Sequence, residues 1–307
     1  MRSYFIHRLL LLLPTLLGAM TLVFLLIHLV PGDPVEVMLG ETANAADKQE
    51  LRRSLGLDLP VLEQYRVFLL NLLKGDLGNS LYEPARVAQM IRLRFPATFE
   101  LALSAMVAAL LISFPLAIFA AIYRGRWPDR CALVFSLLGL SLPNFWLGPL
   151  LMIVFSIQLG WAPVSGRGGL SHLWLPALTL GLGMAAILTR LLRAGLLQTI
   201  QEDFVRTARA KGLAESRVWL KHMLRNALFS VVTIMSLQFG SLLAGSLITE
   251  TIFSWPGIGR LTVQAIQTRD YPVVQGCVLV IAVSYLLISL FTDLLYKLVD
   301  PRVSYDK

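Results

Sequence analysis

The chain has 307 residues, of which 56% are hydrophobic and 15% are charged, and its formal net charge is +8. An ordinary soluble domain has about 25% charged residues, and the apolar residues here gather in runs long enough to cross a bilayer, which takes roughly 20 helical residues. This composition excludes an ordinary soluble protein. Because the cytoplasmic loops of membrane proteins are rich in lysine and arginine, we interpret the positive charge as a property of such loops and not as a sign of nucleic-acid binding.

Six apolar segments predict six transmembrane helices in an all-α membrane protein. A helix is expected for each segment because backbone polar groups in lipid must be satisfied within the segment. The third segment carries Pro143 and Pro149, which predict a kink or a break near 141–148. The predicted spans are 9–30, 99–122, 131–159, 173–197, 227–249 and 273–298.

Lysine and arginine are distributed unequally between the loops, and this predicts the orientation. The segments 123–130 and 190–225 hold 3 and 8 of them, whereas the loops 160–172 and 250–272 hold 1 and 2. Cytoplasmic loops carry the excess of these residues. We therefore expect both termini on the cytoplasmic side and the long 31–98 loop on the outer side.

The 31–98 loop has its own helical pattern. Asp47 followed by Glu50 predicts a capping box that opens a short helix. Apolar residues then recur at helical spacing over 62–72, and the glycines of 75–78 predict the end of that second helix. The loop is expected to be a small helical insertion on the outer surface.

The motifs of nucleotide binding and of catalysis are missing. The sequence has no G-x-x-x-x-G-K-[ST] loop, no G-x-S-x-G and no H-E-x-x-H, and its histidines lack the spacing of metal ligands. Ionisable residues close to the spans fall near their predicted ends, where an interfacial role is expected. The sequence therefore does not support catalysis, and we expect this chain to bind no cofactor or metal itself. The ionisable residues concerned are Glu100, Arg190, Arg193, Glu250 and Asp293.

The loop 198–226 between the fourth and fifth spans predicts a short helix. Asp203 is suited to its N-cap, and Gly212 to the C′ position that follows its end. Phe204 and Ala208 share a face of this helix. The cap, the small residues, the glycine and a second basic helix at 215–225 together favour docking of another protein over an ordinary basic loop. Its positive charge comes from Arg206, Arg209 and Lys211.

This loop resembles the E-A-A-x-x-x-G-x9-I-x-L-P motif of permease subunits in ATP-binding-cassette (ABC) importers. Only Ala208, Gly212 and Leu224 match it, and the departures resemble the dipeptide/oligopeptide/nickel subfamily. Further blocks of that subfamily occur in order along nearly the whole chain. They include HLVPGDP (28–34), LGLDLP (55–60), GDLGNS (75–80), FPATFELAL (95–103), SLPNFWLG (141–148), LPALTLG (175–181), RTARAKGL (206–213), HMLRNAL (222–228), TETIFSWPGIGRL (249–261) and RDYPVVQ (269–275).

The resemblance implies the permease fold of a type I importer in the bacterial inner membrane. A second, homologous permease would complete the pathway, two ATPase subunits would bind ATP and Mg²⁺, and a periplasmic solute-binding protein would deliver the substrate. The large loop after the first span resembles that of the first permease of such a heterodimer. The helix at 203–212 would couple to the ATPase through Asp203, Phe204, Arg206, Thr207, Ala208, Arg209, Lys211 and Gly212.

Two further segments are candidate parts of the pathway. Small residues on the fifth span permit close packing, either against the partner permease and the pathway or within this subunit. The segment 249–261 predicts a re-entrant turn that forms a plug or rim over the pathway, with an interfacial aromatic anchor as the alternative. The pathway candidates are Gly240, Ser241, Ala244, Gly245 and Glu250, and the periplasmic gate candidates are Trp255, Pro256, Gly257 and Arg260.

The substrate is expected to be a di- or oligopeptide, with nickel, a metal–chelator complex or glutathione as alternatives. The two rival classes are a self-sufficient secondary transporter and a polytopic membrane enzyme. The first would need an acidic residue or an ion site at membrane depth and the second a catalytic pair, and neither feature is clear in the sequence. The predicted organisation is an N-terminal transmembrane helix (1–30), a periplasmic loop with short helices (31–98), a five-helix permease core (99–298) that includes the coupling loop 198–226, and a cytoplasmic tail (299–307).

Overall fold

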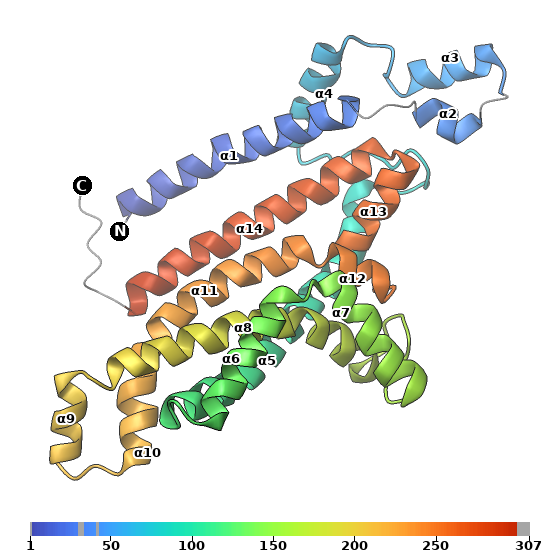
Figure 1. The fold of residues 1–307 in the computed structure, drawn as a ribbon. Coiled ribbons are helices and arrows are strands. Elements are labelled where there is room, and N and C mark those ends of the chain that lie inside the picture. The colour runs from blue at the N-terminus through green and yellow to red at the C-terminus, as the bar shows by residue number, and fades with distance from the viewer. Residues whose placement is uncertain (1, 30–33, 41–42, 300–307) are drawn as a thin grey trace. The chain divides into compact units, whose positions relative to one another are not determined.

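The computed structural model describes residues 2–29, 34–40 and 43–299, and none of these lies in a β-strand. The chain divides into two compact units. Unit 1 comprises Met1–Thr98 and Pro256–Ser284, and unit 2 comprises Phe99–Trp255 and Tyr285–Lys307. Two long helices, α5 (Val87–Ile122) and α14 (Tyr271–Val299), contribute to both units (Figure 1).

Unit 1 holds the helical insertion predicted after the first span. It consists of α1 (Arg2–Leu29), α2 (Pro34–Leu39), α3 (Ala45–Ser54), α4 (Val61–Leu73), α13 (Ile258–Thr268) and the first parts of α5 and α14. A core formed by α5, α13 and α14 holds it together. Gly276 permits the close approach of α14 to α5, because a Cβ there would lie 2.5 Å from Val87 Cγ1. The buried core residues are Val87, Met90, Ile91, Ile258, Leu261, Ala265, Val273, Val274 and Cys277.

The predicted helices of the insertion are present, but the predicted cap of the first one is wrong. Helix α3 is capped by Asn44, whose side chain accepts a hydrogen bond from the Ala46 N–H at 3.3 Å. Asp47 therefore lies inside the first turn, where its negative charge favours the helix dipole without capping it. Helix α4 ends at the predicted stop, with Gly75 in the left-handed region at φ 74°.

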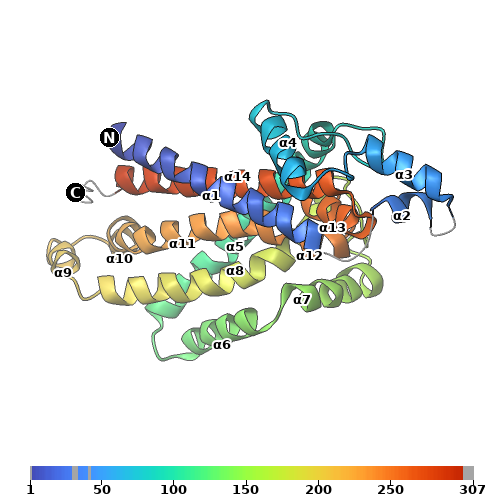
Figure 2. The ribbon, with the colours of Figure 1, turned by 90° about the horizontal axis from the view of Figure 1, so that it is seen from above.

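Unit 2 is built around α8 (Leu170–Thr199). The unit also contains α6 (Trp127–Ser141), α7 (Asn144–Leu151), the π-helix η1 (Met152–Gln158), α9 (Asp203–Ala210), α10 (Glu215–Arg217), the π-helix η2 (Val218–Met223), α11 (Leu224–Gly245) and α12 (Leu247–Ile252). Helix α8 packs against α6, α7 and α11, and α11 runs beside it in both views (Figures 1 and 2). Its apolar stretch is 67% buried, against 33% for α5 and 22% for α14. Helix α8 is thus the internal helix of the unit.

The predicted break in the third span is confirmed. Helices α6 and α7 meet at 107°, and Pro143 is the N-cap residue of α7. Among the described residues, three helices are long and apolar enough to cross a membrane, and there are up to five spans if each bent pair counts as one. Within α1, the apolar stretch Leu13–Leu25 is found among the residues whose side chains are described.

Candidate coupling loop and membrane cavity

Helix α9 begins one residue earlier than expected. The backbone of Glu202 is extended, at φ −71° and ψ 145°, and its carbonyl accepts the Val205 N–H at 3.0 Å, so Glu202 is the N-cap residue. The predicted cap, Asp203, is instead the first helical residue. Its carboxylate lies 3.8 Å from the Arg206 guanidinium, but both groups are almost fully exposed, so the pair adds little stability.

The end of α9 is the one predicted from Gly212. This glycine has φ 74°, and its N–H donates to the Arg209 carbonyl at 2.9 Å. The Leu213 N–H donates to the Ala208 carbonyl at 3.3 Å, which completes the 6→1 and 5→2 bonds of a Schellman motif. A Cβ at Gly212 would meet nothing within 4 Å, so the backbone angle alone explains the glycine.

The buried face of α9 differs from the face expected. Val205 is 0% exposed and Ala208 is 6% exposed, and the helix packs against η2. Ala208 therefore stabilises the loop from inside, and it does not share an outward face with Phe204, which is 38% exposed. The spacing of three residues between Val205 and Ala208 places them on one face of the helix, and this pair was missed.

Most of the exposed side chains of α9, with Lys211 directly after its end, form a ridge that carries two cations, one carboxylate and one aromatic ring. We call it the α9 ridge, and it consists of Asp203, Phe204, Arg206, Thr207 and Lys211. Arg209 is not counted in the ridge because it forms an ion pair. Its Nε and Nη2 donate to the two carboxylate oxygens of Glu215 at 2.8 and 3.3 Å. This ion pair joins the end of α9 to the start of α10 and reinforces the packing on η2.

A cavity of about 400 Å³ lies within unit 2, walled by the α6–α7 break, α8 and α11. Its polar groups are the side chains of Asn144, Gln238 and Ser241, and among the described residues that line it none is charged. Gly183 of α8 faces the break, because a Cβ there would lie 3.6 Å from the Asn144 Oδ1. The remaining lining residues are Gly139, Leu140, Leu142, Pro143, Leu180, Met184, Ile187 and Leu242.

The small residues of the fifth span have different surroundings. Gly240 packs within the subunit, since a Cβ there would lie 2.8 Å from Cδ2 of Tyr285. Ser241, its neighbour, lines the cavity instead. Internal packing, the expected alternative, thus holds for Gly240. The surroundings of Ala244 and Gly245 lie outside the described residues.

Two of the residues proposed for the pathway and its gate are enclosed in unit 2. The side chain of Trp255 is 0% exposed, and the backbone N–H of this residue donates to the backbone carbonyl of Glu250 at 2.8 Å. Glu250 is also 0% exposed, and its carboxylate accepts a hydrogen bond from Ser246 Oγ at 2.9 Å. In this conformation neither side chain offers a surface to a solute or to a binding protein, and neither is an interfacial anchor.

The other gate residues belong to unit 1 and form the start of α13. Gly257 is its N-cap residue with an extended backbone, and the Ile258 N–H donates to Thr98 Oγ1 at 2.8 Å. Pro256 and Arg260 are partly exposed. The part of the predicted turn that begins at Pro256 is therefore the entry to α13.

Two ion pairs of unit 2 were not predicted. Arg193 binds both carboxylate oxygens of Asp129, with 2.8 Å between Nη2 and Oδ2, and the two side chains are only 19% and 5% exposed. Arg193 therefore links α8 to the first turn of α6. The second pair joins Arg167 to Glu100, and the Arg167 guanidinium also lies 5.8 Å from the ring centroid of Trp255. Both pairs join residues more than 60 positions apart, so no pattern of neighbouring residues in the sequence predicts them.

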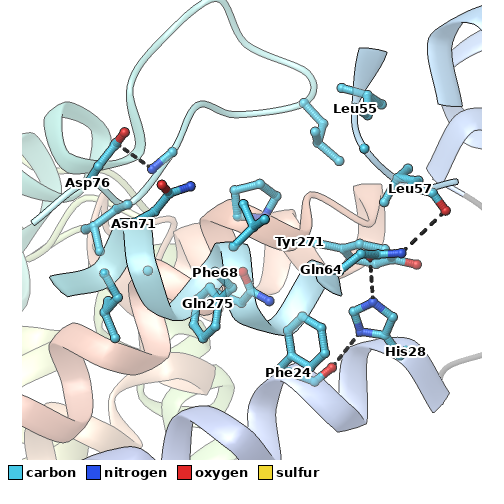
Figure 3. A pocket seen from close by; sticks show the side chains of 18 of the residues that line it. Phe24, His28, Leu55, Leu57, Gln64, Phe68, Asn71, Asp76, Tyr271 and Gln275 are labelled. Atoms are coloured by element: carbon cyan, nitrogen blue, oxygen red, sulfur yellow. Dashed lines mark hydrogen bonds between the residues drawn. The ribbon is translucent and has the colours of Figure 1, made fainter. Parts of the chain in front are cut away.

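A second pocket, of about 230 Å³, lies in unit 1 and is lined by α4, the start of α14, the loops 55–59 and 76–81 and two residues of α1 (Figure 3). His28 stands at its wall with both ring nitrogens engaged. Nδ1 lies 2.7 Å from the Phe24 carbonyl, and Nε2 lies 3.1 Å from Gln64 Oε1. These contacts explain His28 as a link between α1 and α4. No group of three possible metal-binding side chains is found among the described residues.

The chain is similar to known transport proteins over its whole length. Residues 113–305 match the family described as "Binding-protein-dependent transport system inner membrane component", and residues 1–102 match its N-terminal family. It is 48% identical to the glutathione transport system permease protein GsiC of Pectobacterium atrosepticum, over 99% of this chain and 100% of that protein. The GsiC protein of Escherichia coli K12 is 44% identical over the same shares.

Solved structures show the same fold. The inward-facing MetNI methionine ABC transporter superposes with a TM-score of 0.56 at 18% identity, covering 69% of this chain and 97% of that one. An amino acid ABC transporter solved with histidines gives a TM-score of 0.51 at 16% identity, covering 70% and 95%. The chain therefore belongs to the family of binding-protein-dependent transport system inner membrane components, and it is a permease subunit of an ABC importer, not an enzyme.

Proposed function

We propose that this permease imports glutathione or a closely similar short peptide. The observation that carries the proposal is the 48% identity, over 99% of this chain, to a permease named for glutathione transport. Glutathione is itself a tripeptide, so the proposal stays within the peptide class expected from the sequence. The cavity supports a peptide over free nickel, because nickel favours imidazole, thiolate or carboxylate ligands and none occurs among the described lining residues.

The α9 ridge is proposed as the surface that contacts an ATPase subunit. It presents one partly exposed aromatic side chain, Phe204, among basic residues, and aromatic anchors of this kind dominate the energies of many protein interfaces. The ridge lies in the segment richest in lysine and arginine, which favours the cytoplasmic side for α9 and for both termini. A solute-binding protein would then dock on the opposite side, and a second permease would complete the pathway.

The attachment of α9 supports a mechanical role. Val205 and Ala208 fix the helix on η2, and the Arg209–Glu215 pair ties its end to α10. Because η2 continues into α11, and α8 ends four residues before α9, a displacement of α9 acts on both helices that wall the cavity. Binding and release of ATP by the ATPase subunits would then shift the population between cavity states without chemistry on this chain.

The proposal is tested by uptake into vesicles that contain the complete importer. The vesicles are supplied with labelled glutathione, dialanine or Ni²⁺, with and without ATP. We expect ATP-dependent uptake of glutathione that exceeds uptake of the other two. Faster uptake of Ni²⁺ would overturn the proposed substrate, and glutathione uptake that persists when the ATPase subunits are omitted would overturn the coupling to a separate motor.

A further inference from the structure

The cavity in unit 2 exists because a membrane helix is interrupted. Helices α6 and α7 meet at 107° near the middle of the third span, and Leu142 and Pro143 at the break both line the cavity. Irregular backbone at membrane depth is tolerated where protein covers it or where it lines a cavity that contains water. The lining residues Leu180 to Ile187 lie near the centre of the 30-residue helix α8, so the cavity is remote from both ends of that helix.

The lining of the cavity is polar without being charged. The carboxamides of Asn144 and Gln238 each supply donors and an acceptor, and the Ser241 hydroxyl, which donates its hydrogen to the Gln238 backbone carbonyl at 2.8 Å, supplies an acceptor. A peptide group likewise offers one N–H and one C=O, and it is costly to bury unless both are hydrogen-bonded. The apolar remainder of the wall would tolerate varied side chains. This chemistry is complementary to peptide backbone and does not provide a countercharge for a bare ion.

Gly183 determines how much room the cavity has beside Asn144. A Cβ there would meet Asn144 Oδ1 at 3.6 Å and the Gly139 carbonyl oxygen at 3.7 Å, which are ordinary contacts. A side chain at this position therefore fits the backbone and occupies cavity space. Gly195 of the same helix offers a matched control, because its Cβ would meet Ala227 at 3.4 Å and the residue does not line the cavity.

We infer that this cavity is the site through which the solute passes in this subunit, where Asn144, Gln238 and Ser241 hydrogen-bond to the backbone of a short peptide. The volume of about 400 Å³ lies within the range of pockets that hold small molecules, which is about 300 to 1,000 Å³. The inference rests on the proposed import of glutathione. It adds the part of the chain that contacts the solute and the groups of the solute that are recognised.

The first test measures contact directly in the complete importer, in vesicles. Cys131 and Cys277 are replaced by serine and alanine, and Ser241→Cys is introduced as the labelling site. A hydrophilic maleimide should label this cysteine, and S-methylglutathione, which has no thiol or disulfide to react with the cysteine or the maleimide, should slow the labelling several-fold when delivered with the binding protein and ATP. Leu170→Cys, at the exposed start of α8 and outside the predicted span, is the control, which should be labelled but not protected by the solute. Labelling of Ser241→Cys that is unaffected by the solute, or no labelling at all, would overturn the inference.

The second test alters the size and the polarity of the cavity. Gly183→Val should lower the uptake rate by about tenfold or more by occupying the passage, whereas Gly195→Ala should leave it unchanged. Asn144→Leu, nearly equal in size, should lower the rate by about fivefold, the factor expected for one lost hydrogen bond. Uptake that survives Gly183→Val in an assembled complex would overturn the inference and leave the proposed function standing. Absence of glutathione uptake by the unmodified importer would instead overturn the proposed function.

Discussion

The buried ion pair between Asp129 and Arg193 provides a stringent test of the packing of unit 2. Asp129→Asn keeps the size of the side chain but removes the charge that Arg193 faces. Removing one partner of a fully buried pair costs about 3 to 5 kcal/mol, and because Arg193 keeps 19% of its side chain exposed we expect a lower value of about 2 to 3 kcal/mol. Glu100→Gln is the matched control, since the pair with Arg167 is 34% and 39% exposed and should contribute at most about 1 kcal/mol.

The measurement is thermal unfolding of the purified permease in detergent, followed by the loss of a monodisperse elution peak. A domain of 150 to 250 residues shifts its Tm by roughly 2 to 4 °C per kcal/mol, and on this scale Asp129→Asn should lower the Tm by about 4 to 12 °C and Glu100→Gln by at most about 4 °C. Exchanging the two charges, with Asp129→Arg and Arg193→Asp together, should recover part of the loss. Equal, small shifts in both single variants would refute the reasoning that burial makes the Asp129 pair the more important one.

Three further predictions concern α9 and the core of unit 1. Phe204→Ala should reduce co-purification of the ATPase at an unchanged Tm, because this side chain is exposed. Ala208→Arg should lower the Tm itself, because it places a charge on the buried face of α9. Equal changes of Tm in the two variants would contradict the assignment of Phe204 to the exposed face and Ala208 to the buried face. Gly212→Ala should destabilise the loop by about 1 kcal/mol through the left-handed backbone, detectable as faster proteolysis of 198–226, and an unchanged cleavage rate would argue against the Schellman end. Gly276→Leu should abolish assembly, judged by membrane yield, because the new Cβ would lie 2.5 Å from Val87 Cγ1, and a normal yield would show that α5 and α14 can separate.

The features that were predicted correctly depend on neighbours in the sequence. Gly212 ends α9 because the left-handed angle there is costly for any residue with a Cβ. The break between α6 and α7 follows from Pro143, which lacks an N–H and restricts the residue before it. The apolar runs determine which segments are long helices, since run length and hydropathy are properties of the local chain. The different family motifs that follow one another along the chain indicate an importer permease, and recognising them needs no knowledge of tertiary contacts.

The features that were missed depend on residues far apart in the chain. Both Phe204 and Val205 are apolar, and only the position of η2 decides that Val205 is the buried one. Glu250 and Trp255 resemble surface gate residues until the fold encloses them. Arg193 resembles an interfacial cation until Asp129, 64 positions earlier, meets it.

The sequence by itself therefore determined the class of this protein, its long helices and the ends marked by Gly75 and Gly212, because these depend on the length of apolar runs, on charge and on backbone preferences over a few residues. Only the tertiary structure decided which side of α9 is exposed, which ionic groups are paired and where the chain leaves a cavity. The cavity illustrates the reason. Its walls come from 139–144, 180–187 and 238–242, and a volume bounded by three separate segments is a property of their packing.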